Sequence, residues 1–171
     1  MKELKDYVRS IPDFPEPGII FRDITSILQD PDGFKLAIDS LLAMVKDVDF
    51  DVVVGAESRG FIFGVPLAYA EKKGFVPVRK PGKLPAAVYS QEYDLEYGKS
   101  CLEIHQDALK KGQKVLIVDD LLATGGTGRA IAQMVTRAGA EVAGFLFLIE
   151  LEALGGRETL KDYPVQSIIR Y

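Results

Sequence analysis

The segment from residue 115 to residue 127 constrains the fold of this chain more than any other part of the sequence. Its first four residues, 115–118, are apolar and three of them are β-branched, which predicts a buried strand. Two adjacent carboxylates, Asp119 and Asp120, come next, where we expect the strand to end. A short glycine-bearing turn follows, and a helical pattern occupies residues 127–138. This order predicts a strand that feeds a helix through a tight, polar turn.

The polar groups of this turn suit a phosphorylated sugar. Backbone N–H groups at the N-terminus of a helix favour a dianionic phosphate. Thr124 and Thr127 add hydroxyl donors, while ionised Asp119 and Asp120 accept hydrogen bonds from the hydroxyls of a ribose. Adjacent carboxylates repel each other unless something uses them, so we favour a binding role over a turn that only packs.

Strands and helices alternate along the chain from residue 34 to residue 150, which predicts an α/β fold with a mostly parallel sheet and helices on both faces. Strands are expected over 51–55, 75–79, 99–104, 113–120, 140–150 and 164–170, and helices over 2–10, 31–48, 59–73 and 127–138. Residues 80–98 are expected to be irregular. Pro77 indicates that its strand lies near an edge or a bulge of the sheet.

Ligands of such sheets bind outside the carboxyl ends of the strands. Glu57, Arg79, Asp119 and Asp120 all fall at the ends of expected strands. We therefore expect these four residues to face one crevice, although they are far apart in the sequence.

Composition narrows the possible functions. The 171 residues suffice for one domain, and the net charge of -4 argues against a general nucleic-acid binder. A single cysteine and a single histidine exclude an internal disulfide and a metal cage of cysteines and histidines. The N-terminus lacks the apolar stretch of a signal peptide, and no apolar run reaches the roughly 18 residues of a membrane span. We expect a cytoplasmic protein with no nucleic-acid or membrane partner.

The sequence of residues 119–127, Asp-Asp-Leu-Leu-Ala-Thr-Gly-Gly-Thr, resembles the phosphoribosyl-pyrophosphate (PRPP) signature of the type I phosphoribosyltransferases. It is most similar to the adenine phosphoribosyltransferase branch of that family. The resemblance implies one domain over 1–171, with a hood at about 1–33, a core at about 34–171 and a mobile catalytic loop, or lid, at about 80–98. It assigns the 5′-phosphate and the ribose of PRPP to Asp119, Asp120, Ala123, Thr124, Gly125, Gly126 and Thr127.

Four further segments resemble the same family, and they occur along the chain in the order that the family has them. The loop Gly55-Ala56-Glu57-Ser58-Arg59-Gly60 and the basic loop after it imply pyrophosphate binding by Ser58, Arg59, Arg79 and Lys83. The segment Gly18-Ile19-Ile20-Phe21-Arg22-Asp23 implies adenine binding by Ile20, Phe21 and Arg22. The Glu-Tyr-Gly sequence of the lid implies that Glu96 is the catalytic carboxylate beside N7 of adenine and that Tyr97 belongs to the lid.

The activity implied by the resemblance is transfer of the 5-phosphoribosyl group of PRPP to adenine, giving AMP and pyrophosphate in purine salvage. It also implies a homodimer and Mg²⁺, which substrate oxygens and water would hold, with no direct protein ligand. Two alternatives stay open: a phosphoribosyltransferase for a 6-oxopurine, and a non-catalytic regulator that senses PRPP or a purine.

Three residues receive no role in binding or catalysis. We expect Cys101 to be a small buried or half-buried residue, because it lies in a strand-like run with no basic activator nearby. We expect His105 to be structural, because no matched motif assigns it a role. The sequence offers no explanation for Gly128, which follows Thr127 directly.

Overall fold

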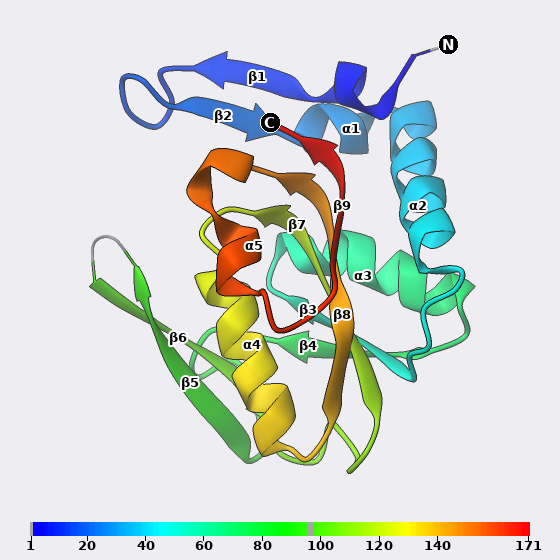
Figure 1. Cartoon of the computed structure of the whole chain (residues 1–171), viewed down its shortest axis with the longest axis vertical. Helices are drawn as coiled ribbons and strands as arrows, with labels where there is room; N and C mark the ends of the chain where they lie inside the picture. Colours follow the sequence, from blue (N-terminus) through cyan, green and yellow to red (C-terminus); the bar gives the residue numbers. More distant parts are fainter. Residues whose placement is uncertain (1, 96–97) are drawn as a thin grey trace.

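A five-stranded parallel sheet forms the centre of the molecule (Figure 1). The computed structural model describes residues 2–95 and 98–171. The strands lie in the order β4-β3-β7-β8-β9. Their bounds are Val52–Ala56 for β3, Gly74–Val78 for β4, Lys114–Leu122 for β7, Glu141–Glu150 for β8 and Val165–Arg170 for β9. The expected α/β fold with a mostly parallel sheet is confirmed, and β4, which contains Pro77, lies at an edge as expected.

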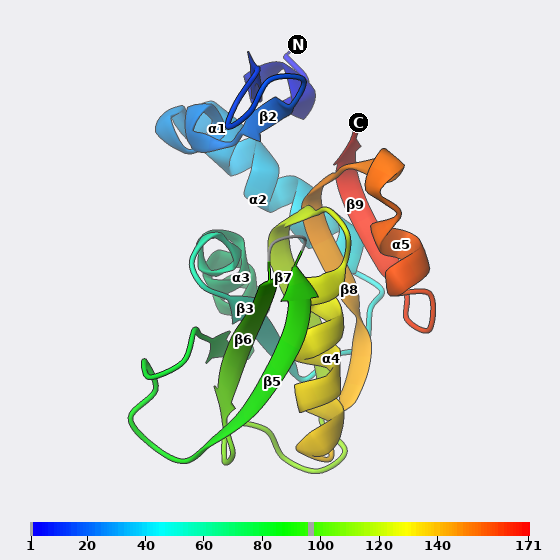
Figure 2. The same cartoon turned by 90° about the vertical axis from the view of Figure 1, so that its left-hand side faces the viewer.

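Helices cover both faces of this sheet (Figure 2). Alternate residues of each strand point to opposite faces, so neighbouring apolar residues enter different cores. Val53 and Leu116 pack with α2 (Pro31–Val45) and α3 (Arg59–Ala70), whereas Val54 and Ile117 pack with α4 (Gly126–Arg137). The nearly continuous apolar sequences of β3 and β7 follow from this coverage on both sides.

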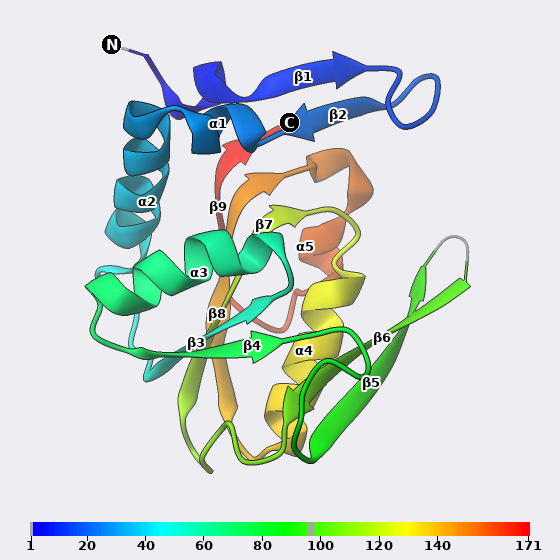
Figure 3. The ribbon, with the colours of Figure 1, turned by 180° about the vertical axis from the view of Figure 1, so that it is seen from behind.

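The N-terminal region is a small antiparallel hairpin that lies across one end of the molecule, near the C-terminus (Figures 1 and 3). The prediction of a helix over residues 2–10 is wrong beyond one turn. Only Leu4–Tyr7 is helical, as a 3₁₀ turn, and β1 (Arg9–Pro12) pairs with β2 (Ile20–Asp23). This partner strand lies beyond a loop, so local periodicity did not reveal it. A short helix, α1 (Thr25–Gln29), also escaped prediction.

Asp23 fixes this hairpin to α1. Its carboxylate accepts hydrogen bonds from the Arg9 Nε (2.9 Å), the Thr25 backbone N–H (2.9 Å) and the Thr25 hydroxyl (2.7 Å). The bonds from Thr25, followed by the Arg9 guanidinium, lower the pKa of Asp23 from 3.8 to about 2.

Because the pKa of Asp23 is lower in the folded protein than in the unfolded chain, the stability it contributes is present above pH 4 and is lost as the pH falls through about 2. A shift of this size corresponds to about 2 kcal/mol. We expect urea unfolding at pH 5 and at pH 2 to show a smaller acid-induced loss in Asp23→Asn than in the unsubstituted protein, by about that amount. An equal loss in both proteins would contradict this role.

Several boundaries differ from the prediction. The helix α3 ends at Ala70 rather than at residue 73, because Lys72 adopts a left-handed φ of 55°. The helix α2 ends at Val45. The strand β7 continues past the two carboxylates to Leu122, because Leu121 and Leu122 still pair with β8. The acidic pair therefore lies within a paired strand, and Leu121 and Leu122 follow it before the strand ends.

The expectation of irregular structure over 80–98 is wrong for its second half. The strand β5 (Val88–Leu95) pairs with β6 (Gly98–His105) in a separate antiparallel sheet of two strands. This hairpin lies beside α4 (Figure 2), and β6 adjoins the edge of the central sheet through a backbone bridge between Glu103 and Arg79. The available signal for β5 was its valine and two tyrosines, residue types that favour strands, together with the alternation of Glu92, Tyr93, Asp94 and Leu95. The abundance of turn residues around residue 82 obscured it.

Candidate functional site

A cavity of about 460 Å³ lies at the carboxyl ends of β3 and β7. It is lined by residues 56–59, Lys80, 93–95, Leu102, 119–128 and Phe147. Of the four residues expected to face one crevice, the structure places Glu57, Asp119 and Asp120 in this lining. Arg79, the fourth residue, is outside the lining, and its Nε lies 3.3 Å from the Glu57 Oε1.

The turn between β7 and α4, at residues 123–127, lines the cavity. Gly125 caps α4 with a left-handed φ of 88°, a conformation that favours glycine. No side chain among the described residues caps this helix, whose first hydrogen bond to the turn runs from the Arg129 N–H to the Gly125 carbonyl. The N–H groups of the first turn therefore have no partner within the helix, and the positive end of the helix dipole adds to them. This arrangement suits a phosphate.

The acidic pair is held in an asymmetric way. Asp120 is buried, and its Oδ2 lies 2.7 Å from the Arg59 Nε. Asp119 is half-buried, and its Oδ1 accepts a hydrogen bond from the Asp120 backbone N–H at 2.9 Å. Desolvation raises the pKa of Asp119 well above its usual range, and the negative charge of Asp120 raises it further. A ligand that donates hydroxyl hydrogen bonds to this pair would offset both penalties.

The loop after β3 lies against the acidic pair. Its Glu57–Ser58 peptide bond is cis. The Glu57 Oε1 accepts a hydrogen bond from the Lys80 backbone N–H at 2.7 Å, and this bond lowers the pKa of Glu57, with Arg79 and Lys83 contributing. A Cβ atom at Gly60 would lie 3.0 Å from the Asp119 Oδ1, so a glycine there lets α3 begin close to the acidic pair.

Arg59 and Lys83 differ in their surroundings. Arg59 lines the cavity, half-exposed, and its guanidinium pairs with Asp120. Lys83 is exposed on the loop after β4 and is not part of the lining.

The residues assigned to adenine lie on β2, outside the lining of the cavity. Ile20 is exposed, and Phe21 packs edge-to-face on Phe14 with ring centroids 5.3 Å apart. The Arg22 guanidinium carbon lies 3.7 Å from the centroid of the Tyr171 ring. The structure thus gathers apolar and aromatic groups on the hairpin but does not bring them to the acidic pair.

Glu96 and Tyr97, the predicted catalytic carboxylate and lid tyrosine, lie outside the described residues. The residues just before them, 93–95, line the cavity. Tyr93 escaped prediction as a cavity residue; its hydroxyl lies 3.5 Å from the Thr127 Oγ1. The alternation of side chains along β5 was the sequence signal from which the orientation of Tyr93 toward the cavity could have been predicted.

The structure shows the surroundings of His105, Cys101 and Gly128, the three residues without an assigned role. The His105 Nε2 accepts a hydrogen bond from the Ala86 N–H at 3.3 Å, at the base of the hairpin, and Cys101 is half-buried opposite Glu92. At Gly128, a Cβ atom would lie 3.1 Å from the Phe145 ring and 3.3 Å from the Leu160 side chain. Glycine at this position lets α4 approach β8 closely.

We expect Gly128→Ala to destabilise the protein by a net amount of about 1 kcal/mol, because overpacking against two buried side chains exceeds the helix propensity that alanine gains. Thermal unfolding measures the difference. Gly74→Ala is a matched control, since the nearest atom to its Cβ would lie 3.8 Å away. A Tm for Gly128→Ala at or above that of the control would show that Phe145 and Leu160 yield without cost.

Comparisons with known proteins extend this description. The family described as "Phosphoribosyl transferase domain" matches residues 24–169. The adenine phosphoribosyltransferase of Lachnoclostridium phytofermentans is 58% identical over 171 residues, which cover 100% of this chain and 98% of the relative. No helix of the described residues has the length and apolar character needed to cross a membrane.

Solved structures agree with these matches. The crystal structure of adenine phosphoribosyltransferase from Thermoanaerobacter pseudethanolicus superposes with a TM-score of 0.95 at 51% identity and covers 98% of both chains. The Saccharomyces cerevisiae enzyme, complexed with an imino-altritol bisphosphate and adenine, superposes with a TM-score of 0.89 at 41% identity and covers 96% of this chain and 95% of its own.

Proposed function

The chain belongs to the phosphoribosyl transferase family, and from this premise we propose that it transfers the 5-phosphoribosyl group of PRPP to adenine, giving AMP and pyrophosphate in purine salvage. The observation that carries the proposal is the union, in one cavity, of an uncapped helix N-terminus with two adjacent carboxylates. These groups match the phosphate and the hydroxyls of a phosphorylated ribose. The identity of relatives over their full length supports adenine as the base.

The ribose 5-phosphate half of PRPP occupies the turn and the acidic pair in this proposal. Ala123, Thr124, Gly125, Gly126 and Thr127 hold the 5′-phosphate, and Asp119 and Asp120 accept hydrogen bonds from the ribose hydroxyls. The negative charge of the pair also favours the positive character that develops at C1 when the pyrophosphate leaves.

The pyrophosphate is assigned to Ser58, Arg59, Arg79 and Lys83. Cations near the departing group stabilise the charge that it develops. Arg59 is paired with Asp120 in the free protein, so substrate binding exchanges one anionic partner of this guanidinium for another. The forked guanidinium suits a pyrophosphate better than an ammonium does.

Adenine is assigned to Ile20, Phe21 and Arg22, and its activation to Glu96. The N9 atom of adenine bonds to C1 as the bond from C1 to the pyrophosphate oxygen breaks, and the pyrophosphate leaves with that electron pair. The proton on N7 passes to the Glu96 carboxylate. Tyr97 belongs to the lid, which excludes the water that would otherwise hydrolyse PRPP.

The donor groups of the site fit Mg²⁺ bound through the substrate. The described residues hold no group of three or more histidine, cysteine, aspartate or glutamate side chains that would cage a metal. The ion usually binds through one or two carboxylates together with substrate phosphates and water. Asp119 and Asp120, the carboxylates beside the proposed phosphate site, are assigned to the ribose hydroxyls, so the ion would be held mainly by substrate oxygens and water. When bound, the ion would neutralise the charge of the pyrophosphate.

The proposal includes a homodimer in the cytoplasm. The family resemblance supports the dimer, and the single cysteine suits a reducing compartment. Sedimentation velocity of the purified chain tests the oligomeric state: a mass of twice 18.8 kDa is expected, and a monomer at micromolar concentration would contradict it.

The experiment that tests the function is a panel of adenine, hypoxanthine, guanine and xanthine, each supplied with PRPP and Mg²⁺, with pyrophosphate release as the signal. We expect turnover with adenine. Turnover confined to an oxopurine would retain the PRPP site and remove the assignment of the base. Binding of PRPP without any turnover would favour the non-catalytic regulator.

A further inference from the structure

A short helix, α5 (Gly156–Thr159), packs directly against the turn that precedes α4. The Thr159 hydroxyl donates a hydrogen bond to the Thr124 carbonyl at 2.7 Å. A Cβ atom at Gly156 would lie 2.6 Å from the Ala123 carbonyl oxygen, and one at Gly125 would lie 2.9 Å from the Gly156 carbonyl oxygen. The turn and α5 therefore touch backbone to backbone, which leaves neither of them room to shift toward the other.

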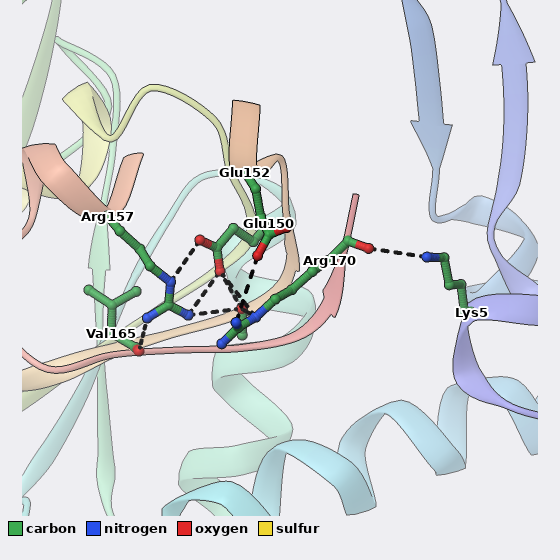
Figure 4. Close-up of polar contacts among 7 residues, drawn as sticks. Lys5, Glu150, Glu152, Arg157, Val165 and Arg170 are labelled. Atoms are coloured by element: carbon green, nitrogen blue, oxygen red, sulfur yellow. Dashed lines mark hydrogen bonds and ion pairs between the residues drawn. The ribbon is translucent and has the colours of Figure 1, made fainter. Parts of the chain in front are cut away.

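A helix of four residues does not hold its shape alone, because helix formation has a costly nucleus. Arg157 fastens α5 to the sheet (Figure 4). Its Nε donates to the Glu150 Oε1 at 2.7 Å and its Nη2 to the Glu150 Oε2 at 2.9 Å, while its Nη1 donates to the Val165 carbonyl at 2.7 Å. One side chain thus joins α5 to the end of β8 and to the start of β9.

Glu150, the anchor of this tether, is buried at the carboxyl end of β8. The Ser167 hydroxyl also donates to its carboxylate, and the Arg170 Nε lies 3.7 Å away. Burial raises the pKa of Glu150, but the hydrogen bonds from Arg157 and Ser167 outweigh it and leave the pKa below its usual value. The carboxylate is therefore ionised and engaged on both oxygens, which makes the tether rigid.

The hydrogen bond from Thr159 determines how the turn faces the cavity. A trans peptide unit is planar, so the Gly125 N–H points opposite to the Thr124 carbonyl. Because Thr159 holds this carbonyl toward α5, the Gly125 N–H points away from α5. Arg157 and Thr159 are outside the lining of the cavity, whereas Thr124 and Gly125 are part of it; Thr159 lines an adjoining pocket on the other side of Thr124.

We propose that Arg157 and Thr159 are positioning residues for the 5′-phosphate and act through α5 on the turn at residues 123–127. This inference rests on the proposed function, because it takes that turn as the phosphate site. Preorganised N–H groups bind an anion without first having to be ordered, so loosening the turn weakens phosphate binding specifically.

Thr159→Val tests the inference with little change in shape. Since the variant loses one hydrogen bond that orders the turn, we expect about tenfold weaker binding of ribose 5-phosphate by calorimetry and about a tenfold higher KM for PRPP. The kcat at saturating PRPP and the KM for adenine should change less than about twofold. Thr159→Ser retains the hydroxyl and should restore both values.

Arg157→Lys tests the other end of the tether, because it keeps the charge and loses the forked geometry. It should also weaken ribose 5-phosphate binding, and it should add little in combination with Thr159→Val, since both act through α5. Arg9→Lys, at the Arg9–Asp23 ion pair on the N-terminal hairpin, is the matched control and should leave this binding unchanged. If Arg157→Lys fails to fold, ribose 5-phosphate binding by Thr159→Val alone tests the inference.

Two results would overturn the inference. Unchanged ribose 5-phosphate binding in Thr159→Val, with binding intact in the unsubstituted protein, would remove it and leave the proposed function standing. Failure of the unsubstituted protein to bind ribose 5-phosphate and to release pyrophosphate would remove both together.

Discussion

Glu96→Gln is expected to lower kcat by about 10²–10⁴, the usual contribution of a positioned general base. The amide keeps the size and the hydrogen-bonding reach of the carboxylate but does not accept the N7 proton of adenine. The affinity for PRPP should stay within about twofold, because the residues assigned to PRPP lie elsewhere, in the turn, the acidic pair and the basic loops. Steady-state kinetics with adenine and calorimetric titration of PRPP measure the two effects separately.

Glu92→Gln is the matched control for this variant. Glu92 lies on β5 in the same hairpin, exposed, with its Oε2 3.8 Å from the Lys99 Nζ. Exposed ion pairs of this kind contribute little, so we expect near-normal turnover. A large loss of kcat in Glu92→Gln, or near-normal turnover in Glu96→Gln, would show that another group accepts the proton.

Replacing Asp119 and Asp120 together by asparagine is expected to weaken PRPP binding by about 100-fold or more, because each charged hydrogen bond to a ribose hydroxyl contributes roughly 1.5–3 kcal/mol. The variant also leaves Arg59 without its anionic partner in the free protein. A control with the same change of net charge is Asp107→Asn with Asp162→Asn, since both aspartates are exposed. Equal PRPP affinity in the two double variants would contradict the assignment of the ribose.

Asp119→Asn alone should also raise the thermal stability of the free protein at pH 7. The pKa of Asp119 is raised in the folded protein, chiefly by burial, so the folded state binds its proton more tightly than the unfolded chain does. The stability that Asp119 contributes therefore falls as the pH rises above about 4. Asparagine removes this penalty, and the gain in Tm over the unsubstituted protein should disappear at low pH. Greater stability in exchange for weaker substrate binding is typical of a binding site.

The central sheet and the gathering of Glu57, Asp119 and Asp120 at one cavity could be predicted from the sequence because their signals are local. Runs such as 115–118 identify buried strands. The helix expected from residue 31 begins at Pro31, and the Asp30 side chain before it accepts hydrogen bonds from two backbone N–H groups of its first turn. The rule that ligands bind at the carboxyl ends of parallel strands then placed Glu57, Asp119 and Asp120 together.

The features that escaped prediction depend on partners distant in the sequence. The strand β1 forms because β2 pairs with it, and β5 forms because β6 does. The tether of α5 joins Arg157 to Glu150, and each of these residues alone has the sequence signature of an ordinary surface charge. The packing of Gly128 against Phe145 likewise depends on β8 lying beneath α4. Local periodicity carries no information about such contacts.

The most direct test of the proposed site is a crystal structure of the protein with PRPP, Mg²⁺ and a non-reacting adenine analogue. The proposal predicts the 5′-phosphate on the backbone N–H groups of residues 125–127 and the ribose hydroxyls on Asp119 and Asp120. It also predicts the pyrophosphate beside Arg59 and the base against Ile20, Phe21 and Arg22. A 5′-phosphate bound away from this turn, with the acidic pair free of the ribose, would contradict it.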